Sequence, residues 1–183
     1  MKGIIFNLLE DFITENFGEE KYEQIIAKCN LTTTEPHVGP GTYEDKDLME
    51  IVARATEELK ISIPDALKAF GKFAFSKLAE KHPNFVKPYQ HPKPFLMTVE
   101  SVIHIEVKKL YEHAYTPTFI YTDTSPDTLT ITYSSKRKLY DLMEGLIDGV
   151  GEFFKSPIQQ THKIYQKNGA ELCDFELTFT ADK

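Results

Sequence analysis

Apolar side chains recur every three to four positions through the first two-thirds of the chain, which is the spacing of one helix face. On this pattern we expect helices over residues 3–17, 45–60, 64–81 and 95–112, with a short amphipathic segment at 19–29. Two stretches interrupt the pattern. Residues 32–41 are rich in threonine, proline and glycine, and residues 82–94 hold four of the ten prolines, so both are predicted to be loops.

Beyond Pro117 apolar and polar residues alternate at every second position, and β-forming residues are common. This pattern predicts strands at 118–122 and 128–137, a helix at 138–154, and two last strands at about 157–166 and 171–180. The last two strands flank Asn168-Gly169, the strongest short signal for a hairpin turn. With Lys167 paired to Ala170, the register places Ile158 opposite Phe179, His162 opposite Phe175 and Ile164 opposite Cys173.

These elements predict an α+β fold, with a helical N-terminal lobe followed by a C-terminal antiparallel sheet that carries a packed helix. We expect one domain over residues 1–183. About 1–60 would form the N-terminal helical lobe, and about 61–183 the remaining helices and a four-stranded sheet.

Length and charge narrow the function classes. A chain of 183 residues and 21.0 kDa can bury a core large enough to enclose a ligand. The formal net charge of −7 argues against nucleic acid as a partner. No stretch approaches the roughly 18 apolar residues of a membrane helix, and no signal-peptide cleavage site follows the start. We therefore expect a cytoplasmic protein without membrane insertion.

One predicted strand carries candidate chemistry. Alternation from Leu129 and Ile131 puts Tyr133, Ser135 and Arg137 on the same, core-facing side. A buried guanidinium needs an anionic partner, and a planar fork beside two hydroxyls suits a carboxylate or a phosphate. Two interpretations stand: the anion belongs to a bound ligand, or it is a protein carboxylate such as that of Asp45.

His104 lies on an apolar face of the predicted helix 95–112. Such a histidine is commonly a hydrogen-bonded core residue. A single imidazole without a second histidine or cysteine nearby makes a poor zinc site. It is nevertheless an adequate axial ligand for haem iron, because the macrocycle supplies four donors. Both interpretations stand on the residues alone.

Several of these residues also form a combination found in a known family. The combination comprises the opening Met1-Lys2-Gly3-Ile4-Ile5-Phe6, Ala69-Phe70-Gly71, His104, Pro117, the Tyr-x-Ser-x-Arg of Tyr133, Ser135 and Arg137, and Glu144-Gly145-Leu146. In this order and spacing the whole chain resembles the H-NOX (haem-nitric oxide/oxygen binding) family, in its stand-alone bacterial form. That family is related to the haem domain of soluble guanylate cyclase.

The resemblance implies ferrous haem b (iron protoporphyrin IX), held noncovalently between the two lobes. His104 would be the single protein ligand to the iron. Tyr133, Ser135 and Arg137 would bind the haem propionates, and Pro117 would distort the ring. Asp45 is expected to orient Arg137, as an acidic residue does in relatives.

The resemblance also bears on gas selectivity. Bound O₂ carries partial negative charge and needs a nearby donor, which O₂-binding relatives supply from a tyrosine at the position of Leu142. Tyr140 lies about 200° around the helix from there and should not reach the pocket. Two supporting polar positions in those relatives correspond to Leu9 and Ala74. The wall opposite His104 would therefore be apolar, lined by Ile5, Leu9, Ala74, Leu78, Leu142 and Leu146. We expect binding of NO and CO with little O₂ binding.

The family signals by conformational change. The resemblance implies that NO weakens the iron–His104 bond, that the helix bearing His104 is released, and that the N-terminal lobe rotates. We expect no output domain after Lys183, and therefore expect a separate histidine kinase or cyclic-di-GMP enzyme as the partner.

Two other functions stay open. A haem-dependent enzyme would need acid or base residues opposite His104, and the expected lining has none. A haem carrier would release haem readily and have no signalling role. His162 and Cys173 share one face of the last hairpin, but two ligands do not make a structural zinc site. We expect both to pack in the core, and Cys29 to pack between helices.

Overall fold

The N-terminal third of the protein is helical, as predicted. The computed structural model describes residues 1–33 and 35–179. Its first helices are α1 (Gly3–Phe17), α2 (Glu19–Ile26) and α3 (Asp45–Leu59). Helix α4 (Ile63–Lys81) follows, and it begins where Ser62 accepts a hydrogen bond from the backbone N–H of Asp65, with Pro64 in the first turn.

The predicted single helix over 95–112 is wrong. The structure instead has a 3₁₀ turn, η1 (Pro83–Phe85), then α5 (Pro92–Leu96), a π-helical turn, η2 (Val99–Ile103), and α6 (His104–Leu110). Helix α5 begins within the predicted loop because prolines are tolerated in a first helical turn. The Thr98 hydroxyl donates to the Phe95 carbonyl at 2.7 Å and so competes with the backbone hydrogen bonds of the helix. The chain turns at Met97 and Thr98, and η2 then runs directly into α6, so His104 lies where the helix changes from π to α.

The C-terminal part is an antiparallel sheet of β1 (Thr118–Ser125), β2 (Thr128–Ser134), β3 (Ile158–Lys167) and β4 (Ala170–Phe179), in the order β1-β2-β4-β3. The predicted register of the last hairpin is confirmed, with Ile158 opposite Phe179, His162 opposite Phe175 and Ile164 opposite Cys173. Asn168 and Gly169 both have positive φ, 51° and 78°, as the tight turn between these strands requires.

The prediction of a strand reaching residue 137 is wrong by three residues. Strand β2 ends at Ser134, and the chain then turns through Ser135 and Arg137 toward α7 (Tyr140–Phe153). The backbone N–H of Lys138 donates to the Ser135 carbonyl, and Lys138 itself has a φ of 51°. Ser135 and Arg137 therefore lie on a turn and not on the pleated surface.

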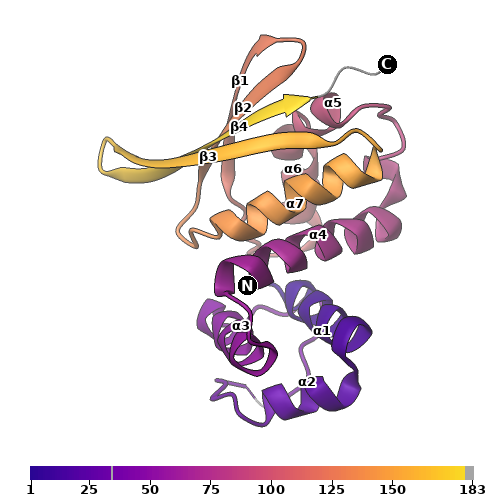
Figure 1. Ribbon diagram of the computed structural model, residues 1–183, viewed down its shortest axis with the longest axis vertical. Coiled ribbons are helices and arrows are strands. Elements are labelled where there is room, and N and C mark those ends of the chain that lie inside the picture. The colour runs from indigo at the N-terminus through magenta and orange to yellow at the C-terminus, as the bar shows by residue number, and fades with distance from the viewer. Residues whose placement is uncertain (34, 180–183) are drawn as a thin grey trace.

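Two apolar cores lie on either side of the junction between the lobes. One contains Phe6, Ile13, Leu48, Ile51 and Phe70 from α1, α3 and the first half of α4. The other contains Phe75, Ile131, Ile147, Phe175 and Leu177 from the second half of α4, the sheet and α7. Figure 1 shows α7 and α4 stacked against one face of the sheet, with α1–α3 beyond them. The lobe boundary near residue 60 stays a prediction, because α4 contributes to both cores.

Helices α4 and α7 meet backbone to backbone. A Cβ atom added at Gly71 would lie 2.3 Å from the Leu142 carbonyl oxygen, and one at Gly145 would lie 2.0 Å from the Lys68 carbonyl oxygen. Both glycines belong to short segments that the sequence comparison singled out, and this close approach explains them.

Across residues 1–33 and 35–179, no helix combines the length and the apolar character needed to cross a bilayer.

Candidate functional site

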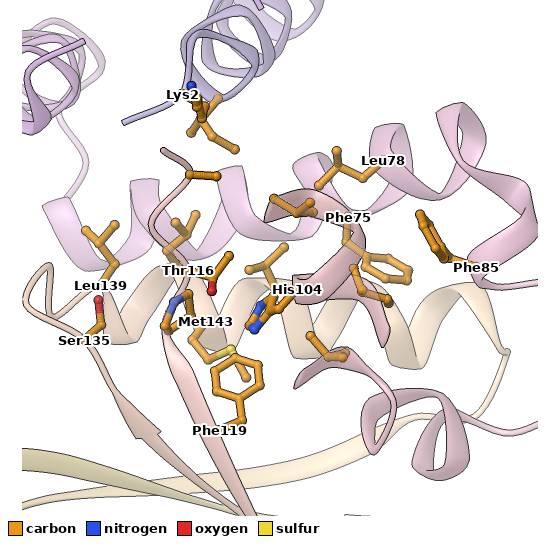
Figure 2. Close-up of a pocket in the computed structure, with 18 of the residues that line it drawn as sticks. Lys2, Phe75, Leu78, Phe85, His104, Thr116, Phe119, Ser135, Leu139 and Met143 are labelled. Carbon is orange, nitrogen blue, oxygen red and sulfur yellow. The ribbon is translucent and has the colours of Figure 1, made fainter. Parts of the chain in front are cut away.

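A cavity of about 370 Å³ lies between the two cores. This volume is within the range of small-molecule and cofactor pockets. Its walls come from α1, α4, α6, β2, α7 and the segment that joins α6 to β1. Figure 2 shows these side chains around the space, with His104 near its centre and Phe85 and Leu139 toward opposite ends.

His104 supplies the cavity with one nitrogen lone pair. The ring is buried, and its Nδ1 lies 2.9 Å from Oε2 of the Glu100 carboxylate. Because a carboxylate oxygen can only accept, Nδ1 carries the proton and the lone pair of the neutral ring lies on Nε2. Burial lowers the pKa of His104 and outweighs the opposing effect of Glu100, so the imidazole is neutral near pH 7. Within the described residues, Nε2 forms no hydrogen bond.

The same carboxylate also fixes the ring to the sheet. Glu100 Oε2 accepts a second hydrogen bond from the backbone N–H of Phe119, at 3.1 Å. The Phe119 ring lies beside the His104 ring, with centroids 5.0 Å apart. The orientation of the imidazole is thus set from two directions.

Arg137 forms the polar end of the cavity. Its Nε donates to Asp45 Oδ2 at 2.7 Å, and its Nη1 donates to the Tyr115 carbonyl at 2.8 Å. The Tyr115 ring stacks on the guanidinium, 4.7 Å from its centroid to Cζ. In the described parts of the chain no hydrogen bond uses Nη2, so this edge of the fork can receive an anion. The sequence left two anionic partners open for Arg137, a bound ligand or a protein carboxylate. The structure shows the carboxylate of Asp45 on one edge of the guanidinium, and the Nη2 edge is left for a ligand.

Tyr133 and Ser135 lie beside Arg137 on the cavity wall, as the sequence predicted, although only Tyr133 belongs to β2. Burial raises the pKa of Tyr133, so its phenol stays protonated and can donate a hydrogen bond. Pro117 lines the same side of the cavity. Two hydroxyls and a guanidinium edge therefore converge at one end of an otherwise apolar space.

The wall opposite His104 agrees with the sequence prediction in part. Four of the six expected side chains line the cavity: Ile5, Leu78, Leu142 and Leu146. Leu9 and Ala74 do not line it; they are buried one layer behind, in the N-terminal core. The apolar character of the wall is unaffected.

Tyr140 does not supply a donor to this wall. Its hydroxyl donates to Glu171 Oε1 at 2.7 Å, on the side of α7 that faces the hairpin. Two polar residues elsewhere in the lining are His82, at the end of α4, and Lys2, whose ammonium donates to the Pro40 carbonyl and the Thr42 hydroxyl. The Thr116 hydroxyl is buried at the cavity without a hydrogen-bond partner in the described residues.

Sequence reasoning missed two residues of the site. Glu100 stands four positions before His104, a spacing that brings two side chains together on a helix, so the signal was present. Tyr115 carries no sequence signal, because its role depends on the turn after α6 folding back onto Arg137.

The last hairpin holds no metal centre among the residues described. The expectation that His162 packs in the core is wrong: the residue is exposed, its Nδ1 lies 2.7 Å from Glu144 Oε1, and its ring lies beside Phe175. Cys173 is fully buried, which raises the pKa of its thiol to about 11. Over residues 1–33 and 35–179 no three His, Cys, Asp or Glu side chains are grouped in a way that could hold a metal ion.

These features fit a haem. The cavity is apolar on its faces, one wall presents a free imidazole lone pair, and one end carries a cation and two hydroxyls suited to carboxylates. An unpartnered buried hydroxyl at Thr116 is also expected where a polar ligand edge belongs.

Comparison with known proteins agrees with this chemistry. A family model described as Haem-NO-binding matches residues 2–162. The fold is similar to that of an Fe(II) unliganded H-NOX protein from K. algicida, with a TM-score of 0.89, 27% identity, and coverage of 100% of this chain and 98% of the other. An H-NOX protein from S. oneidensis in the Fe(II)NO ligation state gives a TM-score of 0.90 and 31% identity, with 99% of this chain and 100% of that chain covered. An H-NOX domain from Shewanella oneidensis in the Fe(II)CO ligation state gives a TM-score of 0.88 and 31% identity, with 100% of both chains covered.

Proposed function

We propose, from the premise that this chain belongs to the Haem-NO-binding (H-NOX) family, that it is a haem b-based sensor of NO and CO that binds little O₂. The observation that carries the proposal is the pairing of a free imidazole lone pair at His104 with an apolar wall across the same cavity. In this proposal the protein has no catalytic activity of its own and works in the cytoplasm.

The residues that would hold the cofactor divide by chemistry. His104 Nε2 would be the single protein ligand to the iron. The free edge of Arg137, with Tyr133 and Ser135, would bind the propionates, and Pro117 would contact the ring. When bound, the haem would supply a ferrous iron to which NO and CO bind.

The apolar wall supports selectivity against O₂. Side chains of Ile5, Leu78, Leu142 and Leu146 offer no hydrogen-bond donor. Tyr140, the nearest phenol on α7, is engaged with Glu171. O₂ needs a donor to stabilise its partial charge, whereas NO and CO do not, so the wall favours these two gases.

A conformational signal can follow the contacts that join the lobes. Helix α6 carries His104 and continues into the segment that contains Tyr115. The backbone carbonyl of Tyr115 accepts a hydrogen bond from Arg137. Arg137 in turn is bonded to Asp45 at the start of α3 in the N-terminal lobe. A displacement of α6 would therefore act on the contact between the lobes. Its extent is limited by the difference in gas affinity between the two conformations.

The signal would pass to a separate protein, for which a histidine kinase and a cyclic-di-GMP enzyme are the two candidates. Either partner would respond to a change in how the lobes are arranged. The proposal therefore needs only that the two arrangements of the lobes bind the partner with different affinity.

The visible spectrum of the purified, reduced protein tests the proposal. We expect a Soret band that shifts on addition of NO and of CO and does not shift in air. Protein that stays colourless after reconstitution with haem would refute the proposal. A reversible O₂ complex would overturn the selectivity while leaving haem binding intact.

A further inference from the structure

We propose that Glu100 is a positioning residue that sets the strength of the bond between His104 and the iron. This inference rests on the proposed function. It starts from the contact of 2.9 Å between Glu100 Oε2 and His104 Nδ1. The two residues are four positions apart, with Glu100 in the π-helical turn η2 and His104 at the first position of α6, so helical spacing brings their side chains together.

A carboxylate is the strongest hydrogen-bond acceptor a protein can place behind a ligating imidazole. A hydrogen bond to an ionised acceptor is about twice as strong as one between neutral groups. It draws the Nδ1 proton toward Glu100 and leaves more electron density on Nε2, which makes Nε2 a better donor to a metal. Glu100 thus strengthens the bond that the proposed signal has to loosen.

Glu100 is itself held in place by β1. Its Oε2 accepts from the Phe119 N–H at 3.1 Å, and its own backbone N–H donates to the Tyr121 hydroxyl at 3.3 Å. The Tyr121 hydroxyl donates onward to the Leu96 carbonyl at 2.8 Å. Burial raises the pKa of Tyr121 to about 12, so this hydroxyl keeps the proton it donates. The carboxylate is therefore attached to the sheet through both its side chain and its backbone.

This attachment has a second effect. The His104 ring cannot turn away from its orientation without breaking its hydrogen bond to a carboxylate that stays with β1. Glu100 therefore favours the ligated arrangement over the released one, and the strength of its hydrogen bond sets how readily His104 leaves the iron.

The test compares Glu100→Gln and Glu100→Asp with a matched control, Glu106→Gln. The control removes the same charge from the same region of chain, but Glu106 pairs with Lys109 at 2.6 Å and does not contact His104. Glutamine keeps an acceptor for the Phe119 N–H, which protects the local fold. The haem-loaded ferrous proteins are examined by resonance Raman spectroscopy for the iron–histidine stretching band, and by transfer of haem to apomyoglobin.

We expect Glu100→Gln to move the iron–histidine band to lower frequency and to raise the haem-loss rate about 10- to 100-fold, the usual effect of losing an outer partner of a ligand. Glu100→Asp should fall between wild type and Glu100→Gln, and Glu106→Gln should match wild type. An unchanged band in Glu100→Gln, or an equal shift in Glu106→Gln, overturns the inference while His104 ligation and the proposed function stand. Wild type without any iron–histidine band overturns both.

A measurement without haem covers the case in which Glu100→Gln retains too little haem. Imidazole ¹⁵N chemical shifts of the haem-free proteins report which ring nitrogen carries the proton. Wild type should show the proton on Nδ1 of His104, and Glu100→Gln should show a mixture of the two tautomers. The same Nδ1 tautomer in both proteins would show that Glu100 does not control the ring and would overturn the inference.

Discussion

The two walls of the cavity differ in how their side chains are held. On the His104 wall, the side chains that would hold a cofactor are each fixed by another group: Glu100 holds His104, while Asp45 and Tyr115 hold Arg137. On the facing wall, Ile5, Leu78, Leu142 and Leu146 offer only packing. In the proposed function, the His104 wall therefore determines what is bound and how firmly, and the apolar wall selects among gases because it offers no polar contact. Four substitutions test this division of roles.

Removal of the imidazole should have the largest effect. His104→Gly deletes the imidazole lone pair that would bind the iron, so the haem-loss rate should rise by more than the roughly 100-fold that loss of an outer partner can cost. Added free imidazole should restore the Soret spectrum by occupying the space left by the side chain. His113→Gly is the control, because His113 is exposed and already has a positive φ of 58°. Unchanged haem retention in His104→Gly would show that His104 is not the ligand.

A donor placed on the apolar wall should change gas selectivity. Leu142→Tyr puts a phenol at the lining position on α7. A hydrogen bond to a charged group is worth about 1.5–3 kcal/mol, which is about 10- to 100-fold in O₂ affinity. Leu142→Phe supplies the same ring without the hydroxyl and should bind O₂ no better than wild type. Equal O₂ titrations for the two variants would show that the missing donor is not what excludes O₂.

Loss of the guanidinium fork should weaken cofactor retention more moderately. Arg137→Lys keeps the positive charge but cannot bond Asp45, the Tyr115 carbonyl and a propionate at once. We expect haem transfer to apomyoglobin to become about tenfold faster, in line with the loss of a charge-assisted hydrogen bond. Lys136→Arg is the control on the same turn. A lysine variant that retains haem as well as wild type would show that charge alone holds the propionates.

The smallest expected effect is on the pH dependence of stability. Burial alone would raise the pKa of Asp45, but hydrogen bonds from Arg137 and the N-terminal ammonium outweigh it and lower the pKa below its usual range. A lowered pKa contributes stability above the usual carboxyl pKa and loses it as the pH falls through the folded-state value. Thermal unfolding from about pH 6 down to pH 3 should therefore show a slightly steeper loss for wild type than for Asp45→Asn. Parallel curves would contradict this contribution.

Periodic segments of the chain were predictable, and departures from periodicity were not. The register of the last hairpin follows from Asn168-Gly169, because a two-residue turn leaves one pairing. The interruption at Met97 and Thr98 could not be read from apolar spacing, because the apolar period continues across the turn in which the Thr98 hydroxyl bonds the Phe95 carbonyl. The end of β2 at Ser134 was missed for a related reason: Ser135 and Arg137 keep the alternation of the strand although the backbone has already turned.

The candidate site divides in the same way. The residues assigned from motif spacing line one cavity, as expected: His104, Tyr133, Ser135 and Arg137. Leu9 and Ala74 were assigned to the wall by correspondence with relatives, yet the structure places them in the N-terminal core and not on the cavity wall. Tyr115 depends on a turn whose path is set by tertiary contacts, which no local pattern records.

The contact between Gly71 and Gly145 has a consequence for what variation the chain can tolerate. A single added carbon at either position would sit 2.3 Å or 2.0 Å from a carbonyl oxygen of the facing helix, closer than any nonbonded carbon can approach. In a library that samples every amino acid at every position, these two should therefore accept glycine alone. Neither residue lines the cavity, so a screen for haem colour would score them as essential for a reason that is purely spatial: they set how far apart α4 and α7 stand, and with that distance the width of the cavity.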